Sequence, residues 1–234
     1  MKVFPVVFVC VVMGVSVMVA TPLFAQQETL AQAESANEYE FNKWGYTWHK
    51  DVSPAPGGGT FVAGNVQVDP DQVVLTLNEY SDGNSEGAEI ATLTSFQYGT
   101  YTFSYWQDIV ESGSVASGFS YINNSQTEID VEQQGQYPGR WDFTNWLTTA
   151  KKQWSFVRGY PATQEHTLKY VWLPTKITWY LDGVRVAVHT QNIPSAPAPF
   201  LFNFWGTNTP LWGGTATPGT RHMIITNFSF KPLK

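Results

Sequence analysis

The chain has 234 residues, with 13 basic against 19 acidic side chains and a formal net charge of −6 at pH 7. This balance argues against nucleic acid and against anionic polysaccharides as partners, because both favour basic grooves. The 10 Trp, 11 Tyr and 15 Phe residues supply more flat apolar faces with polar edges than a core of this size needs. A neutral ligand built from rings suits this composition.

Residues 1–25 predict a secretory signal cleaved before Gln26, because one Lys precedes a long apolar run that ends at the small residue Ala25. A retained membrane anchor is the alternative, since the run is nearly long enough to span a bilayer and Leu23 stands where a small residue is preferred. We expect a secreted protein, extracellular or periplasmic, with no membrane contact after cleavage.

Cleavage of this segment changes the chemistry that the mature chain can use. It removes Cys10, the only cysteine, so the mature chain has no disulfide and no Cys ligand or nucleophile. It also removes one basic and no acidic residue, which makes the mature net charge −7. The stability of the mature protein must therefore come from its core.

The polar residues 26–40 predict a spacer, and residues 41–234 predict one domain, because all-β sandwiches and barrels often exceed roughly 200 residues undivided. After residue 41, short alternating or apolar runs are separated by Gly, Pro, Asn and Asp, and no long helical stripe interrupts them. This pattern predicts an all-β sandwich or barrel. The runs that predict strands lie at 61–68, 72–80, 99–106, 114–122, 127–133, 166–173, 176–189, 200–205 and 223–230.

The clearest hairpin signal is KITWYLDGVRVAVH, residues 176–189, where two β-rich runs flank Asp182 and Gly183. An Asp-Gly pair suits the positive φ angles of a two-residue turn. Two loops are also predicted: the prolines of 191–200 cannot serve a central ladder, and SPAPGGGT at 53–60 is rich in turn residues.

The stretch TEIDVEQ places Glu128, Asp130 and Glu132, which we call the acid row, at alternate positions with Ile129 and Val131 between them. Because side chains alternate across a strand, the three acids share one face while the apolar pair can enter the core. Acidic residues have poor strand propensity and like charges on one face repel, so the row points to a functional site. A solvated outer face is the alternative. Three carboxylates would also suit Ca²⁺, although the loop spacing and glycine turn of a familiar calcium motif are absent.

Crowded carboxyl groups titrate apart, so that one stays protonated at neutral pH while another is ionised. Glycoside cleavage needs this pair: an acid to protonate the leaving oxygen and a carboxylate to attack the anomeric carbon. On a flat strand the Cα atoms of Glu128 and Glu132 would be ~13 Å apart, whereas a retaining pair has its carboxyl groups ~5 to 5.5 Å apart. A strongly bowed, concave strand is needed to close this gap, and the spacing alone leaves retention and inversion open.

Glu-Ile-Asp-Val-Glu followed by Gln-Gln-Gly resembles the signature of glycoside hydrolase family 16. Further segments are similar in the same order: GAEIATLTSFQYGTYTF and SVASGFSYI before the acid row, then EHTLKYVWLPTKITWYLDGVRV and FLFNFW after it. The resemblance implies a jelly-roll β-sandwich of the concanavalin A-like type, with a concave substrate cleft, that hydrolyses or transfers β-linked polysaccharide with retention. The uninterrupted Glu-x-Asp-x-Glu is closer to the branch of lichenases and xyloglucan transglycosylases than to laminarinases and agarases.

The resemblance implies that Glu128 is the nucleophile, Asp130 its helper and Glu132 the general acid/base. It also has departures, since Gln133 and Gln134 stand where lichenases usually carry large apolar residues. These changes leave the chemistry intact and put the substrate in doubt.

Substrate-binding residues are implied on four further segments. Asn203 and Trp205 match an Asn-x-Trp pair beside the cleavage point, and Ala91 replaces the Arg of an Ala-Glu-x-Arg segment. Core packing is the alternative for each aromatic residue, because rings at alternate positions also fill sandwich interiors. The implied set is Glu89, Phe119, Tyr121, Trp146, Asn203 and Trp205.

The sequence therefore predicts a secreted, retaining endo-β-glucanase that hydrolyses neutral β-1,3/1,4-linked glucan. A transglycosylase on β-glucan or xyloglucan is one alternative, and a non-catalytic, lectin-like carbohydrate-binding protein is another. The predicted chemistry requires no cofactor or metal. A β-linked polysaccharide is the expected partner, and we expect a monomer.

Overall fold

The computed structural model describes residues 38–122 and 126–234, which form sixteen strands, a short 3₁₀ helix and their connections. The predicted signal at 1–25 and the spacer at 26–40, apart from its last three residues, lie outside the described residues. The first strand, β1 (Glu40–Lys43), starts one residue before the predicted domain.

The acid row lies in a sheet that we call the cleft sheet, whose neighbouring strands all pair antiparallel. β1 forms one end of this sheet and β11 forms the other. Starting from β11, the strands in order across the sheet are β11 (Lys151–Arg158), β10 (Arg140–Thr148), β9 (Thr127–Gln134), β8 (Ser114–Ile122), β15 (Ala198–Gly206), β6 (Ser85–Phe96), β2 (Tyr46–Lys50) and β1.

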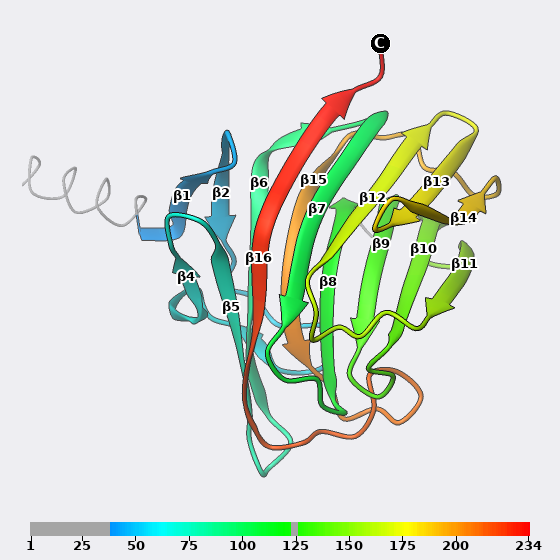
Figure 1. Cartoon of the computed structure of the whole chain (residues 1–234). Helices are drawn as coiled ribbons and strands as arrows, with labels where there is room; N and C mark the ends of the chain where they lie inside the picture. Colours follow the sequence, from blue (N-terminus) through cyan, green and yellow to red (C-terminus); the bar gives the residue numbers. More distant parts are fainter. Residues whose placement is uncertain (1–37, 123–125) are drawn as a thin grey trace, which may run out of the picture. The chain divides into compact units, whose positions relative to one another are not determined.

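A second sheet, which we call the back sheet, is also antiparallel. Figure 1 shows its curved strands β16, β7 and β12 passing in front of the strands of the cleft sheet. The strands in order are β4 (Val66–Val68), β5 (Val73–Glu79), β16 (Gly219–Pro232), β7 (Gly99–Gln107), β12 (His166–Leu173), β13 (Lys176–Leu181) and β14 (Val184–His189).

Strand β6 joins the two layers, because its first residues pair with β5 while its later residues pair with β15 and β2. The short strand β3 (Thr60–Phe61) pairs parallel with the same first part of β6. The result is a jelly-roll β-sandwich, which confirms the predicted fold class.

Aromatic rings fill the space between the sheets. Phe103 of β7 lies 5.0 Å from Phe200 of β15, between ring centroids, and Phe200 stacks at 4.4 Å on Phe228 of β16. Tyr101 and Tyr170, on the neighbouring strands β7 and β12, stack at 4.4 Å. Much of the aromatic composition is therefore core packing, and fewer rings are left for a ligand than the composition indicates.

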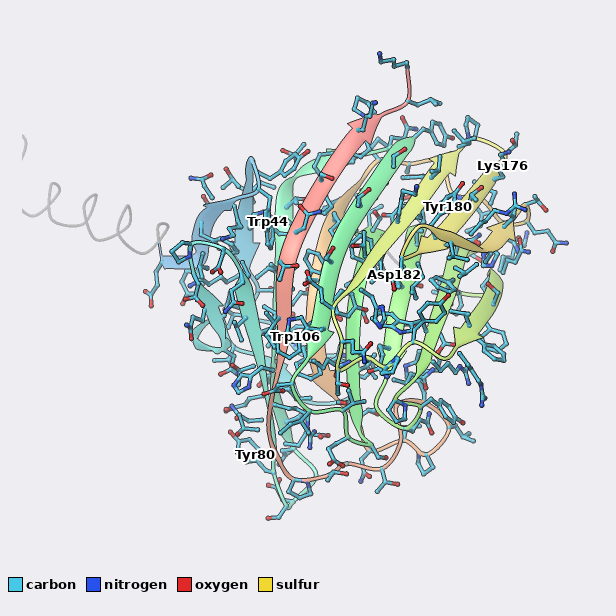
Figure 2. All side chains as sticks on the ribbon, viewed as in Figure 1. Trp44, Tyr80, Trp106, Lys176, Tyr180 and Asp182 are labelled. Carbon is cyan, nitrogen blue, oxygen red and sulfur yellow. The ribbon has the colours of Figure 1, made fainter. Side chains whose placement is uncertain are left out.

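The predicted hairpin is confirmed at the β13–β14 turn, where Asp182 (labelled in Figure 2) and Gly183 have φ angles of 49° and 78°. The Asp182 carboxylate also accepts hydrogen bonds from the backbone of Thr167 and from the ring of His166. The second ring nitrogen of His166 contacts the Pro161 carbonyl at 3.0 Å. His166 is thus fixed at the start of β12 by structural hydrogen bonds.

Several segments differ from the runs that predict strands, since β1, β2, β6 and β10 all form outside those runs. The run at 61–68 is broken by the 3₁₀ helix η1 (Ala63–Asn65), because Asn65 closes a turn onto Val62 and its side chain bonds the Glu86 carbonyl. Residues 151–158 are absent from the predicted set yet form β11. Its two leading lysines and polar alternate positions obscure the strand pattern.

A buried histidine fixes the cleft sheet to β14 behind it. His189 is 1% exposed, and its ring contacts Asn145 Oδ1 of β10 at 2.7 Å and Ser155 Oγ of β11 at 2.8 Å. The Asn145 amide nitrogen donates to the Gln191 and Asn192 carbonyls, so its oxygen accepts from His189 Nδ1–H. In the neutral ring with its proton on Nδ1, His189 Nε2 accepts the Ser155 hydroxyl proton.

Burial lowers the pKa of His189 to about 4. The unfolded chain binds this proton more readily, so the stability that neutral His189 contributes is complete above pH 6.5 and is lost as pH falls towards 4. We expect the stability advantage of wild type over a His189→Gln variant to shrink by about 1 to 2 kcal/mol between pH 7 and pH 5. Urea unfolding of both proteins at pH 7 and pH 5 measures the two free energies of unfolding. If these free energies changed equally with pH in the two proteins, the prediction would be contradicted.

Candidate active site

The predicted acid strand is β9, and its side chains alternate as expected. Ile129 and Val131 are buried in the core, while the acid row faces the opposite side of the cleft sheet. Asp130 is 5% exposed, and Glu128 and Glu132 are half-buried. The acid row is therefore not a solvated outer face.

The antiparallel register sets the neighbours of each acid. Glu128 is paired with Tyr121 of β8 and Trp146 of β10, so two aromatic residues flank it. Glu132 is paired with Ser117 of β8 and with a fourth acid, Asp142 of β10. One end of the acid row is thus flanked by rings, and the other by a further charge.

A cleft of about 950 Å³ opens above this face, and all nine predicted site residues line it. They come from five neighbouring strands, β6, β15, β8, β9 and β10, so pairing across the sheet brings them together. Residues that the sequence reasoning missed also line the cleft: Asp51, Ser53, Pro54, Pro56, Phe61, Ser117, Thr144, Lys152, Trp154, Leu201 and Trp212.

On the β6 side, Asn203 Nδ2 donates a 3.0 Å hydrogen bond to Glu89 Oε2. Burial raises the pKa of Glu89 to about 8, although the hydrogen bond from Asn203 acts to lower it. The neighbouring carboxyl group of Asp51 adds to the rise. Within the described part of the chain, no donor reaches the buried Asn203 Oδ1. Glu89 is therefore a neutral carboxylic acid at pH 7, and the Asn203 oxygen is a buried acceptor beside it.

In the centre of the row, Asp130 accepts a 3.0 Å hydrogen bond from Trp146 Nε1. Burial, followed by repulsion from Glu128 and Glu132, raises the pKa of Asp130 well above its usual value. The Trp146 hydrogen bond and the charge of Lys152 only partly oppose this rise. The uncharged form of Asp130 is therefore favoured, which relieves the repulsion along the acid row.

Glu132 has the pKa expected of a general acid. Burial, then repulsion from Asp142 and Glu128, raises the pKa of Glu132 to about 8, while Lys152 opposes the shift. Because the charge of Glu128 contributes to this rise, the two glutamates are close enough to interact electrostatically. At pH 7, Glu132 is protonated and ready to donate.

Asp142 is fully buried and is held by three side chains. Its Oδ1 accepts from the Arg140 guanidinium at 2.6 Å and from Trp154 Nε1 at 2.9 Å, and its Oδ2 accepts from Gln134 Nε2 at 3.0 Å. Gln134 Oε1 in turn accepts from the backbone of Gly213. Gln134, a departure from the family pattern, therefore connects Asp142 to the loop that carries Trp212 into the cleft.

The aromatic residues of the cleft differ in how much of each ring is buried by core packing. Trp205 is 7% exposed and packs with Ala55, Phe61 and Val115 in a small second core, so only part of its ring faces the cleft. Phe119 and Tyr121 lie 6.4 Å apart between ring centroids and are more open. Core packing thus accounts for most of Trp205, whereas the two β8 rings remain available to a ligand.

Among residues 38–122 and 126–234, no group of three or more His, Cys, Asp or Glu side chains is arranged to hold a metal ion. No helix in the same residues is long and apolar enough to cross a membrane.

Comparison with known sequences identifies the family. A model described as glycosyl hydrolases family 16 matches residues 58–223, which include every predicted site residue. A beta-glucanase from Paenibacillus macerans is 31% identical over 182 residues, which cover 72% of this chain and 76% of that protein. A beta-glucanase from Bacillus licheniformis is 26% identical over 226 residues, covering 88% and 93% of the two chains.

Solved structures agree on the fold. The structure of Bacillus licheniformis beta-glucanase matches with a TM-score of 0.73 at 23% identity, covering 84% of this chain and 96% of that one. A prokaryotic beta-1,3-1,4-glucanase (lichenase) from a mouse hindgut metagenome also matches with a TM-score of 0.73, at 21% identity, covering 84% and 97%. With the family model spanning most of the chain, this protein belongs to glycoside hydrolase family 16 and is a glycoside hydrolase.

Proposed function

We propose that the protein is a retaining endo-β-glucanase that cleaves neutral β-1,3/1,4-linked glucan. The observation that carries this proposal is the acid row itself, in which a protonated Glu132 and Glu128 face one aromatic-lined cleft from the same strand. A family relationship to proteins named beta-glucanase supports the same activity.

In the first step, Glu128 attacks the anomeric carbon while Glu132 protonates the oxygen of the leaving sugar. The glycosidic bond breaks, a covalent glycosyl-enzyme forms at Glu128, and Glu132 becomes a carboxylate. Glu132 then removes a proton from water, the water oxygen attacks the anomeric carbon, and Glu128 is released. Asp130 lies between the two, and burial together with repulsion from both glutamates raises its pKa well above the usual value, which favours its uncharged form beside Glu128.

The shape and polarity of the cleft support an internal cut in a long neutral chain. Its lining extends from β6 to β11, six strands that span about 25 Å at ordinary strand spacing. Aromatic rings in its lining offer faces to sugars. A neutral Glu89 likewise offers hydrogen bonds without repelling or attracting ions.

The predicted signal at 1–25 supports secretion. N-terminal sequencing of protein recovered from the medium of an expressing cell tests cleavage before Gln26. Sedimentation of the mature chain tests the expected monomer.

The proposed roles predict that Glu128→Gln lowers kcat by more than about a thousandfold, because the amide cannot form the glycosyl-enzyme. Binding of an oligosaccharide should change little, since Gln keeps the size of Glu. Reducing-sugar release and titration calorimetry measure the two effects. Glu40→Gln, at an exposed acid on β1, is the matched control and should keep full activity. A Glu128→Gln variant with a tenth of wild-type activity would refute the assignment.

The raised pKa of Glu132 predicts the alkaline limb of kcat/KM near pH 8, because activity is lost when the acid loses its proton. Asp142→Asn removes a repelling charge and should move this limb to lower pH. Lys152→Gln removes an attracting charge and should move it to higher pH, each by about half to one unit. Melting curves establish that both variants fold. Limbs that stay in place, or that both move in one direction, would show that these charges do not act on Glu132.

Retention predicts that the first product released from mixed-linkage glucan carries the β-anomeric configuration, which proton NMR detects before mutarotation. An α-configured first product would exclude a nucleophilic Glu128. The same reaction, screened on lichenan, laminarin, xyloglucan and agarose, tests the linkage. Products longer than the substrate, formed after adding an acceptor oligosaccharide, would identify a transglycosylase.

A further inference from the structure

The cleft sheet ends at β11, whose cleft-facing side chains are unusually large and exposed. Alternate residues Lys152, Trp154, Phe156 and Arg158 share this face, and Trp154 and Phe156 are 43% and 45% exposed. The other face of β11 is anchored by Gln153 and Ser155, whose side chains bond the segment around His189. Packing therefore does not account for the two exposed rings.

Trp154 and Phe156 form a continuous surface, which we call the edge platform. Their ring centroids are 5.3 Å apart, with an interplanar angle of 36°. The Arg140 guanidinium lies 4.6 Å from the centroid of Phe156 and 5.2 Å from that of Trp154, and Asp142 fixes it in place. The platform is thus held in one orientation, which lowers the entropy cost of binding a ligand there.

The edge platform continues the cleft beyond the acid row. Trp154 lines the cleft, whereas Phe156 lies outside its lining. β11 is two strands from β9, about 10 Å away at ordinary spacing, on the side opposite Glu89 and Asn203. A chain that crosses the strands of the cleft sheet and passes Glu132 would therefore reach these rings last.

The geometry points to the edge platform as an accessory carbohydrate-binding site that holds sugar rings of a long β-glucan after the chain leaves the cleft across β11. This inference rests on the proposed function. Tilted aromatic faces of this kind suit the apolar faces of neutral sugars, and the Arg158 guanidinium, 5.4 Å from the centroid of Phe156, supplies hydrogen-bond donors beside them.

Phe156→Ala tests the site, because Phe156 donates no hydrogen bond and lies outside the cleft lining. Kinetics are measured on the mixed-linkage glucan polymer and on its oligosaccharides, from the shortest that wild type cleaves upward. We expect KM for the polymer and the longer oligosaccharides to rise about three- to tenfold with kcat unchanged. The shortest substrate should be unaffected, since it does not reach β11.

Two further variants separate binding from structural effects. Phe156→Tyr keeps the ring and should retain wild-type KM on every substrate. Tyr80→Ala removes a comparably exposed ring, 43% exposed, from the β5–β6 hairpin, which Figure 2 places at the opposite side of the view from β11. It should change KM for no substrate.

The outcomes are distinguishable. A Phe156→Ala variant whose KM is unchanged, or changed equally for all lengths, would overturn the edge platform while leaving the glucanase intact. A wild-type protein that cleaves no β-glucan would overturn the proposed function and this inference with it.

Discussion

Crowding of carboxyl groups on one face of β9 is the constraint on which the site depends. Three adjacent ionised acids would repel one another strongly in a partly buried cleft. The fold reduces this repulsion by raising the pKa of Asp130, by raising that of Glu132 to about 8 so that it is protonated at pH 7, and by placing Lys152 beside them. The raised pKa that reduces repulsion within the acid row also supplies a proton donor, Glu132, next to the candidate nucleophile Glu128. The same protonation therefore serves both the stability of the fold and the proposed chemistry.

The charge of Asp142 would be costly if it were left unpaired, because the residue is fully buried. Arg140 forms an ion pair with it, Trp154 and Gln134 donate hydrogen bonds to it, and its charge repels the carboxylate form of Glu132. The departure at Gln134 and the acid at 142 thus belong together. The same Arg140 supports the exposed rings of β11, so the tuning of the acid and the shape of the cleft end share a side chain.

The two ends of the cleft differ in character. On the β6 side, Glu89 and Asp51 form a carboxyl pair with Asn203, and no arginine stands at position 91. On the β11 side, Lys152 lies 4.3 Å from the Trp146 ring centroid, next to further exposed aromatic faces. One end is therefore built for hydrogen bonds to hydroxyl groups, and the other for contact with ring faces. This polarity gives a neutral chain a preferred way to lie across the sheet.

The sequence by itself determined what depends on local spacing: the all-β class, the turn at Asp182, and the face shared by the acid row. The family resemblance added residues such as Glu89 and Trp146, which no local rule relates to Glu128. Only the tertiary structure brought Asp142 and the edge strand β11 to the site. Contacts across an antiparallel sheet are set by strand register, which joins residues far apart in the chain. Spacing along one strand carries no information about that register.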